Sequence, residues 1–210
     1  MSVAAHAVTL RLAALLLDHP DRELYRATEA MAAVAAPLGR DAGGPELREF
    51  LAHRAAIGEA AAQEEYVATF DFHKRNSLHL SYYRDGDKRQ RGATLVGLKR
   101  RYREAGLELT RGELPDYLPA MLEFAALVPD EAEAVLRRFR ATIELLRVSL
   151  RDMDSPYALV LDAVGHVLPA MSAEELSEAR RIALEGPPEE LVGLEPFAPP
   201  EVMPVAGVTR

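Results

Sequence analysis

Apolar residues recur at intervals of three and four positions along almost the whole chain, which is the spacing of one face of an α-helix. No segment shows the strict apolar–polar alternation that is typical of a half-buried strand. The pattern therefore predicts an all-α, single-domain bundle of about nine helices, of which the helix over 130–150 is the longest. The predicted helices span residues 7–18, 21–36, 45–57, 59–70, 88–105, 115–128, 155–168 and 172–185, together with the long helix that starts at 130 and continues past 150 and a further short helix over 74–83.

Residues that cap or interrupt helices support these boundaries. His19 precedes Pro20 and therefore avoids the α region, which ends the first helix, and Asp21 is suited to the N-cap of the second. Gly106 is suited to a C-terminal cap. Two further N-termini are predicted from Ser155 followed by Pro156, and from Ser172 with Glu175, which together have the form of a capping box.

The composition changes after Gly186, because prolines become frequent enough to exclude a helix. We expect this tail to be extended, and either mobile or laid along the surface. The sequence thus predicts a helical domain over 1–186 and a proline-rich tail over 187–210.

Composition limits the classes of function. Of the 210 residues, 49% are hydrophobic and 28% are charged, which is typical of a globular protein that can bury a core. The absence of cysteine excludes disulfides, thiolate metal sites and cysteine nucleophiles. The longest apolar run, 12–17, is too short to span a membrane, and no convincing signal peptide is present, so we expect a soluble cytoplasmic protein without stable membrane insertion.

No catalytic motif stands out. The six histidines include no pair at the spacing of a helical zinc site, although His73 and His79 lie near Asp71 and could approach one another in a loop. Surface or hydrogen-bonded histidines explain the pattern more simply. No phosphate-binding glycine loop and no nucleophile elbow occur. The sequence therefore predicts a protein that is not an enzyme and that needs neither a metal nor a cofactor.

Basic residues cluster in the predicted helices 88–105 and 130–150, where they are most simply the solvated faces of amphipathic helices. Contact with an anionic partner is the functional alternative. The net charge of −8 argues against broad binding to a nucleic-acid backbone, so we expect no nucleic-acid partner.

The segment 113–126 combines a helix start with a polar cluster. Pro115 fits the first turn of the predicted helix, and Glu113 and Asp116 place two carboxylates at its N-terminal end. In the simplest interpretation these acids only cap the helix, and each would contribute about 1 kcal/mol to the stability of the fold. In the functional interpretation they attract a basic ligand.

A second segment offers aromatic residues beside acids. Tyr66 and Phe70 are four residues apart on one predicted helix, and Tyr117 belongs to the later segment. Aromatic pairs at this spacing are more often core packing than binding surface. An apolar groove edged with acids would nevertheless suit an amphipathic peptide that carries Lys or Arg. The candidate peptide-binding residues are Tyr66, Phe70, Asp71, Glu113, Asp116 and Tyr117.

These segments resemble the assembly chaperones of respiratory nitrate reductase, the NarJ or delta subunit family, which is related to the TorD and DmsD families of helical chaperones. The resemblance extends in order over residues 8–185. It is carried by segments 15–21, 65–71, 76–83, 87–92, 102–109 and 113–126.

The resemblance implies an all-α chaperone that binds the catalytic (alpha) subunit of nitrate reductase, through that subunit's N-terminal segment, while molybdenum cofactor is inserted. Residues 73–75 and the proline-rich tail have no role that the resemblance explains. Three alternatives remain open at this point: a chaperone of another molybdoenzyme of the dimethyl-sulfoxide-reductase type, a helical nucleic-acid-binding regulator, and a small-molecule hydrolase.

Overall fold

The computed structural model describes residues 3–85, 88–109 and 112–185, which form twelve α-helices and two short 3-10 helices and contain no β-strand. The predicted all-α single domain is confirmed, whereas the predicted tail over 187–210 lies outside the described residues and stays a prediction. The elements are α1 (Val3–Leu16), α2 (Arg22–Arg26), α3 (Thr28–Ala35), η1 (Arg40–Ala42), α4 (Gly44–Ile57), α5 (Glu59–Phe70), η2 (Lys74–Asn76), α6 (Ser81–Arg84), α7 (Lys88–Glu104), α8 (Leu118–Leu127), α9 (Pro129–Arg138), α10 (Arg140–Asp152), α11 (Tyr157–Val167) and α12 (Ala173–Glu185).

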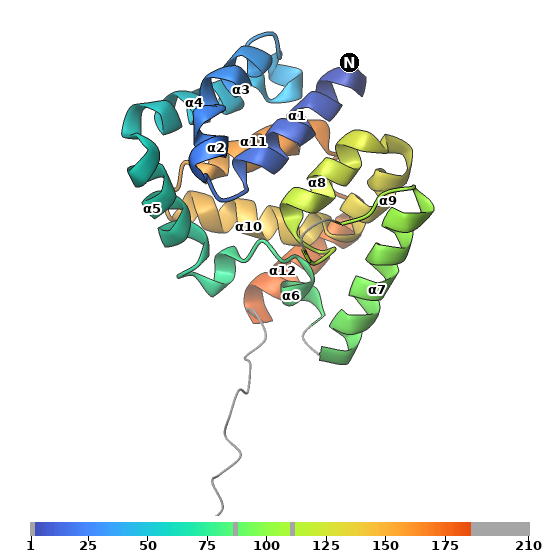
Figure 1. Cartoon of the computed structure of the whole chain (residues 1–210). Coiled ribbons are helices and arrows are strands. Elements are labelled where there is room, and N and C mark those ends of the chain that lie inside the picture. The colour runs from blue at the N-terminus through green and yellow to red at the C-terminus, as the bar shows by residue number, and fades with distance from the viewer. Residues whose placement is uncertain (1–2, 86–87, 110–111, 186–210) are drawn as a thin grey trace, which may run out of the picture.

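Helix α1 forms much of the core, because it packs against α8 on one side and α11 on another (Figure 1). Its apolar positions Leu12 and Leu16 are almost wholly buried. Helix α11 also contacts α4, and the junction is close at Gly43, where a Cβ atom would lie 2.5 Å from the Ala163 Cα. Gly43 has a φ of +66°, so both its backbone conformation and its lack of a side chain are needed there.

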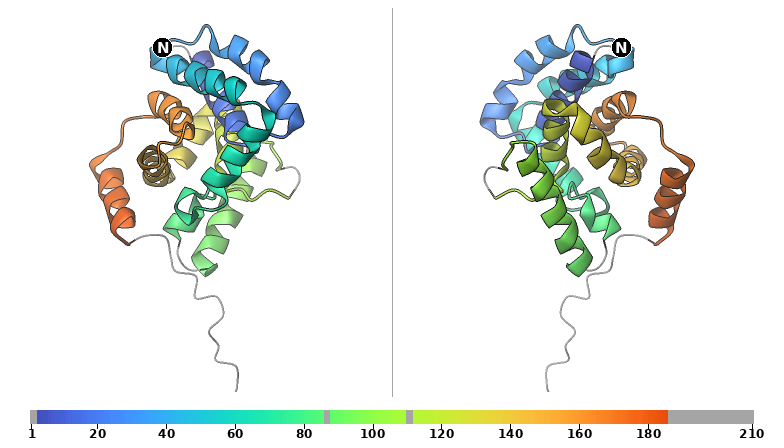
Figure 2. Two further views of the ribbon diagram at one scale, coloured as in Figure 1. Left: turned by 90° about the vertical axis from the view of Figure 1, so that its left-hand side faces the viewer. Right: turned by 90° about the vertical axis from the view of Figure 1, so that its right-hand side faces the viewer.

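Two helices lie at the periphery of the bundle. Figure 2 shows α12 standing apart from the main body, and α7 at the edge of the molecule. Helix α12 packs on α10, and its Ala179 and Ile182 form a small apolar cluster with Tyr83 of α6. This contact places the C-terminal end of α12 beside α6 and the start of α7.

Two predicted helices are interrupted where a local contact competes with the helical hydrogen bonds. The helix predicted over 21–36 divides at Ala27 into α2 and α3, and the Thr28 hydroxyl donates to the carbonyl oxygen of Tyr25. The helix predicted over 130–150 divides at the fully buried Phe139, whose N–H bonds to Leu136 rather than continuing the α-helical pattern. The longest described helix is therefore α7, and the expectation for 130–150 was wrong.

The helix predicted over 74–83 is also wrong, because Asn76 anchors this segment to the core. Its side-chain amide donates to the carbonyl oxygen of Thr69 over 2.8 Å, and its amide oxygen accepts from the Ser149 hydroxyl over 2.7 Å. The asparagine is fully buried, so these bonds replace water. The chain forms η2, then an irregular stretch over 77–80, and only then α6.

Several predicted caps are confirmed. Asp21 accepts a hydrogen bond from the Leu24 N–H, and Ser172 and Glu175 make the two reciprocal bonds of a capping box. Gly106 has a φ of +76° just beyond α7, as a C-terminal cap requires. Ser155 was expected to cap α11, but the N-cap residue is Pro156 and no side chain bonds there. No helix among the described residues is long and apolar enough to cross a membrane.

Candidate functional site

A hollow of about 830 Å³ opens where the C-terminal end of α5 meets two irregular segments, 71–79 and 112–117. Five of the six residues predicted from sequence line this hollow, although they come from segments more than forty residues apart. These are Tyr66, Phe70, Asp71, Glu113 and Tyr117. The sixth, Asp116, lies behind the wall and is fully buried.

A short antiparallel contact of backbone holds the two segments together. The Leu80 N–H donates to the carbonyl oxygen of Asp116 over 3.0 Å, and the Leu118 N–H donates to that of Leu78 over 2.8 Å. These bonds flank an isolated bridge between His79 and Tyr117. The segments that precede α6 and α8 therefore build the hollow, rather than the faces of two neighbouring helices.

Aromatic rings form the floor. Tyr66 and Phe70 are only 6% and 7% exposed, and their ring centroids lie 4.9 Å apart. Both rings also contact Tyr157 of α11, so the core-packing interpretation holds for most of their surface. Burial raises the pKa of Tyr66 to about 12, so its hydroxyl stays protonated at neutral pH. It lies 3.3 Å from the Leu17 carbonyl oxygen and 3.4 Å from the Tyr117 hydroxyl.

Tyr117 joins the two walls. Its hydroxyl donates to Asp18 over 3.3 Å, and its ring stacks on His79 with the centroids 5.3 Å apart. Burial, followed by the proximity of Tyr66 and Asp18, raises its pKa well above the usual range. The ring is therefore neutral and held by polar contacts at its tip. Asp18 was not among the predicted site residues, although the family-like segment 15–21 contains it.

Asp116 has a different role from the one predicted. Helix α8 begins at Leu118 with Tyr117 as N-cap, and no side chain bonds to that cap, so Asp116 does not cap the helix. Its carboxylate instead accepts from the Ser81 N–H over 3.2 Å and from the Ser81 hydroxyl. His79 Nδ1 lies 3.4 Å away and Arg91 approaches to 3.7 Å.

The predicted helix start fails here because Pro119, rather than Pro115, occupies the first turn of α8. The Pro115 carbonyl oxygen instead accepts from the Tyr102 hydroxyl over 2.8 Å, which fixes the segment before the helix. Burial by itself would raise the pKa of Asp116. The hydrogen bonds from His79 and Ser81 and the charge of Arg91 outweigh burial and hold this pKa below its usual value, so the carboxylate is charged at neutral pH.

Charged and apolar side chains form the mouth of the hollow. Asp71 and Glu113 are exposed there, opposite the exposed Lys74. Two exposed apolar residues nearby were not predicted: Leu114, which lines the hollow, is 40% exposed, and Phe72, which follows the lining residue Asp71 in the chain, is 77% exposed. Each directly adjoins a predicted acid, but exposure of an apolar side chain in a loop gives no periodic signal. The arrangement is an aromatic floor with a mixed, mainly acidic rim.

His73 and His79 both line the hollow. Within the described ranges, no group of three or more histidine, aspartate or glutamate side chains is arranged to hold a metal ion.

A second hollow of about 580 Å³ lies between α1, α3 and α8 and is mostly aliphatic. Its charged residues, Arg11 and Glu123, pair with each other. Of the described residues, no aromatic one lines this second hollow, and its one acid is already paired. The first hollow is therefore the stronger candidate for a binding site.

The described residues thus form an all-α protein with an aromatic hollow whose rim is mainly acidic. The sequence model of the family described as nitrate reductase delta subunit matches residues 34–161, which is more than half of the chain and includes every predicted site residue. The chain belongs to this family.

Curated relatives agree with this assignment. The probable nitrate reductase molybdenum cofactor assembly chaperone NarJ of Bacillus subtilis is 34% identical over 179 residues, which cover 85% of this chain and 97% of the relative. The nitrate reductase molybdenum cofactor assembly chaperone NarJ of Escherichia coli is 34% identical over 74% of this chain and 67% of its own length. The nitrate reductase-like protein NarX of Mycobacterium tuberculosis is 36% identical over 75% of this chain, but the match covers only 24% of that longer protein.

Proposed function

We propose that this protein is a cytoplasmic assembly chaperone of nitrate reductase, which binds the catalytic subunit while molybdenum cofactor is inserted. Family membership and the names of the relatives support this role. The same names favour nitrate reductase over another molybdoenzyme of the dimethyl-sulfoxide-reductase type. They also describe assembly chaperones rather than enzymes, which supports a protein that acts by binding.

The observation that carries the proposal is the meeting of the two family-like segments in one hollow. Tyr66 and Tyr117 come from different segments, and their hydroxyl oxygens lie 3.4 Å apart. An amphipathic client segment would place its apolar side chains against the aromatic floor, Phe72 and Leu114, and its Lys or Arg side chains against Asp71 and Glu113. The proposed client segment is the N-terminal segment of the nitrate reductase catalytic subunit.

Asp116 supports this site without touching the client. Its carboxylate bonds to Ser81 and His79 on one side of the hollow while its own backbone lies on the other. This buried carboxylate therefore acts together with the backbone hydrogen bonds to fix the spacing of the two walls. We assign Asp116 as a positioning residue, and Asp71, Glu113 and Tyr117, with the exposed edges of Tyr66 and Phe70, as contact residues.

Calorimetric titration with a synthetic peptide of that N-terminal segment tests the proposal. Phe72→Ala should weaken binding about tenfold, since aromatic anchors dominate peptide interfaces. Glu113→Gln should weaken it about threefold, with a smaller dependence on salt, because a rim charge contributes modestly.

The matched controls are Leu184→Ala, 89% exposed on α12, and Glu108→Gln, exposed outside the hollow. Both should bind the peptide like the wild type. Unchanged affinity in both site variants would place the peptide elsewhere. A complete absence of peptide binding by the wild type, together with failure to co-purify with the apo catalytic subunit, would contradict the proposed client.

A further inference from the structure

Helix α7 carries a charge opposite to that of the rest of the protein. Its 17 residues include seven Lys and Arg and one Glu, which is a net charge of +6. The whole chain has a net charge of −8, so the remaining residues carry −14. Such a separation concentrates positive potential on one peripheral helix, and an anionic partner is the natural complement.

Five of the seven basic residues of the helix are exposed, whereas Arg91 turns inward towards Asp116. Thr94, Leu98 and Tyr102 are buried against the body. The opposite side presents a row of exposed side chains, with Val96 in its middle at 71% exposed. We call this row the basic face of α7; its described members are Arg89, Val96, Lys99, Arg100 and Arg103.

We infer that the basic face of α7 binds the acidic C-terminal segment 186–210 of the same chain. That segment contains four glutamates, Glu189, Glu190, Glu195 and Glu201, and a single basic residue, Arg210, which gives it a net charge of −3. The inference is independent of what the hollow binds.

The geometry allows this contact. Helix α12 ends at Glu185, at the same end of the molecule as α6 and the start of α7 (Figures 1 and 2). The ion pair between Arg84 of α6 and Glu178 of α12 holds these elements together. The 25 residues that follow Glu185 can span roughly 80 Å when extended, whereas α7 is about 25 Å long.

Charge directs the segment to α7 rather than to the hollow. Asp18, Asp71 and Glu113 would repel a segment of net charge −3 at the mouth of the hollow. Each exposed ion pair on α7 contributes little alone. The covalent connection, however, supplies an effective concentration on the order of millimolar, so a few weak pairs suffice. The contact should therefore be sensitive to salt, and it would shield the basic face from other anions.

The natural absence of cysteine makes a disulfide test direct. The test variant is the full chain with both Val96→Cys and Ala198→Cys. The control variant carries Val34→Cys and Ala198→Cys, because Val34 is 48% exposed on α3, and α3 lies at the far end of the molecule. Under mild oxidation at low salt, the Val96 pair should form an intramolecular disulfide at least about tenfold faster than the Val34 pair.

Proximity along the chain could itself favour the Val96 pair, so charge removal is the deciding measurement. Glu189→Gln, Glu190→Gln, Glu195→Gln and Glu201→Gln together should reduce the rate for the Val96 pair severalfold, and so should 1 M salt. A rate that responds to neither change overturns the inference. Disulfide-linked dimers as the main product also overturn it, since the partner would then be a second copy. Thermal melts before oxidation establish that each variant is folded.

Discussion

The pair of helices α10 and α11 and the walls of the hollow are both well packed, but they are stabilised by opposite arrangements of polar and apolar groups. In α10 and α11, apolar side chains such as Leu146 and Leu161 are buried, and the charged side chains pair with one another at the edge of the interface, where they are partly exposed apart from the buried Arg140. In the walls of the hollow, a charged carboxylate, Asp116, is itself fully buried. The first region is specified by periodic sequence, and the second by individual polar contacts.

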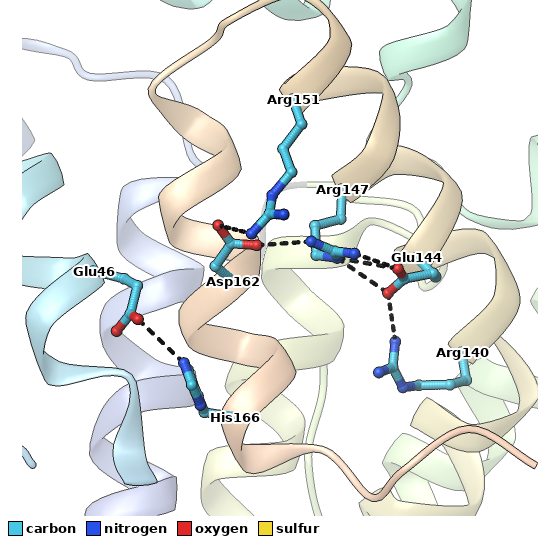
Figure 3. A network of polar contacts seen from close by, with 7 residues as sticks. All are labelled: Glu46, Arg140, Glu144, Arg147, Arg151, Asp162 and His166. Atoms are coloured by element: carbon cyan, nitrogen blue, oxygen red, sulfur yellow. Dashed lines mark hydrogen bonds and ion pairs between the residues drawn. The ribbon is translucent and has the colours of Figure 1, made fainter. Parts of the chain in front are cut away.

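Figure 3 shows the surface network that joins α10 to α11. Arg147 bonds to Glu144 on its own helix and, over 3.0 Å, to Asp162 on α11. Arg140 and Arg151 extend the network at its two ends. The bonds from Arg147 hold the pKa of Glu144 below its usual value, although partial burial opposes this. The network lies outside an apolar interface that already holds the helices together.

The walls of the hollow have no such interface. Segments 71–79 and 112–117 have few periodic apolar positions, so backbone hydrogen bonds and Asp116 take over the role of the core. Removal of a single charge should therefore have very different consequences in the two regions. It should matter little at the surface of α10 and a great deal behind the hollow.

The largest expected effect is in the apolar interface. Leu161→Ala should lower the free energy of unfolding by about 3–4 kcal/mol, because Leu161 is fully buried and its removal leaves a cavity. Urea denaturation measures this, with Val148→Ala on α10, 41% exposed, as the control that should change little. A loss below about 1 kcal/mol for Leu161→Ala would mean that the interface is not tightly packed.

A slightly smaller loss of stability is expected behind the hollow. Asp116→Ala should lower the free energy of unfolding by about 2–3 kcal/mol, since Ser81 loses its hydrogen-bond acceptor and Arg91 loses its nearby countercharge. Peptide affinity should fall as well, whereas Leu161→Ala should leave the affinity of the folded fraction unchanged. The control is Glu113→Ala at the exposed rim, which should alter stability by less than about 0.5 kcal/mol. Wild-type stability in Asp116→Ala would remove the contrast between the two regions.

The same carboxylate predicts a dependence on pH. Because the folded-state pKa of Asp116 is depressed, its contribution to stability is fully present above the unfolded-state pKa of about 3.9. That contribution is lost as the pH falls through the lower, folded-state pKa. Urea midpoints measured from pH 5 downwards should therefore decline more steeply for the wild type than for Asp116→Asn. Parallel curves for the two proteins would show that Asp116 is not paired in the folded state.

The smallest effect is expected in the surface network. Arg147→Met should lower the free energy of unfolding by about 1 kcal/mol or less, because the arginine side chain is only partly buried and the apolar contacts beneath it remain. Arg22→Met, whose side chain is 72% exposed on α2, is the control and should be neutral. Melting temperatures at low and high salt should converge for Arg147→Met and the wild type. A loss as large as that of Asp116→Ala would contradict the comparison.

Periodicity predicted the regular part of the fold well, because an amphipathic helix leaves a repeated signal that local contacts rarely hide. The capping box at Ser172 and the cap at Asp21 are equally local, and both are confirmed. The helix breaks at Ala27 and Phe139 were not predicted. The first depends on a competing side-chain hydrogen bond and the second on burial of Phe139 in the core, and neither has a periodic signal in the sequence.

The candidate site was predicted only in part. The sequence could indicate Tyr66, Phe70, Asp71, Glu113 and Tyr117 as residues of two related segments, and the structure places all five around one hollow. It could not indicate Phe72 and Leu114, whose exposure depends on the path of the loops. Their contribution to peptide binding stays a prediction until it is measured.

The sequence by itself determined the helical class, most helix positions and the family, because these depend on short-range spacing and on motifs that survive without a structure. Only the tertiary structure decided the role of Asp116. A carboxylate two residues before a helix is suited to capping on local grounds. Here the backbone bridge at Tyr117 turns it away from the helix and towards Ser81, His79 and Arg91, three residues that lie 25 to 37 positions earlier in the chain. Long-range pairing of that kind has no periodic trace in a sequence, because it depends on which distant segments the folded core brings together.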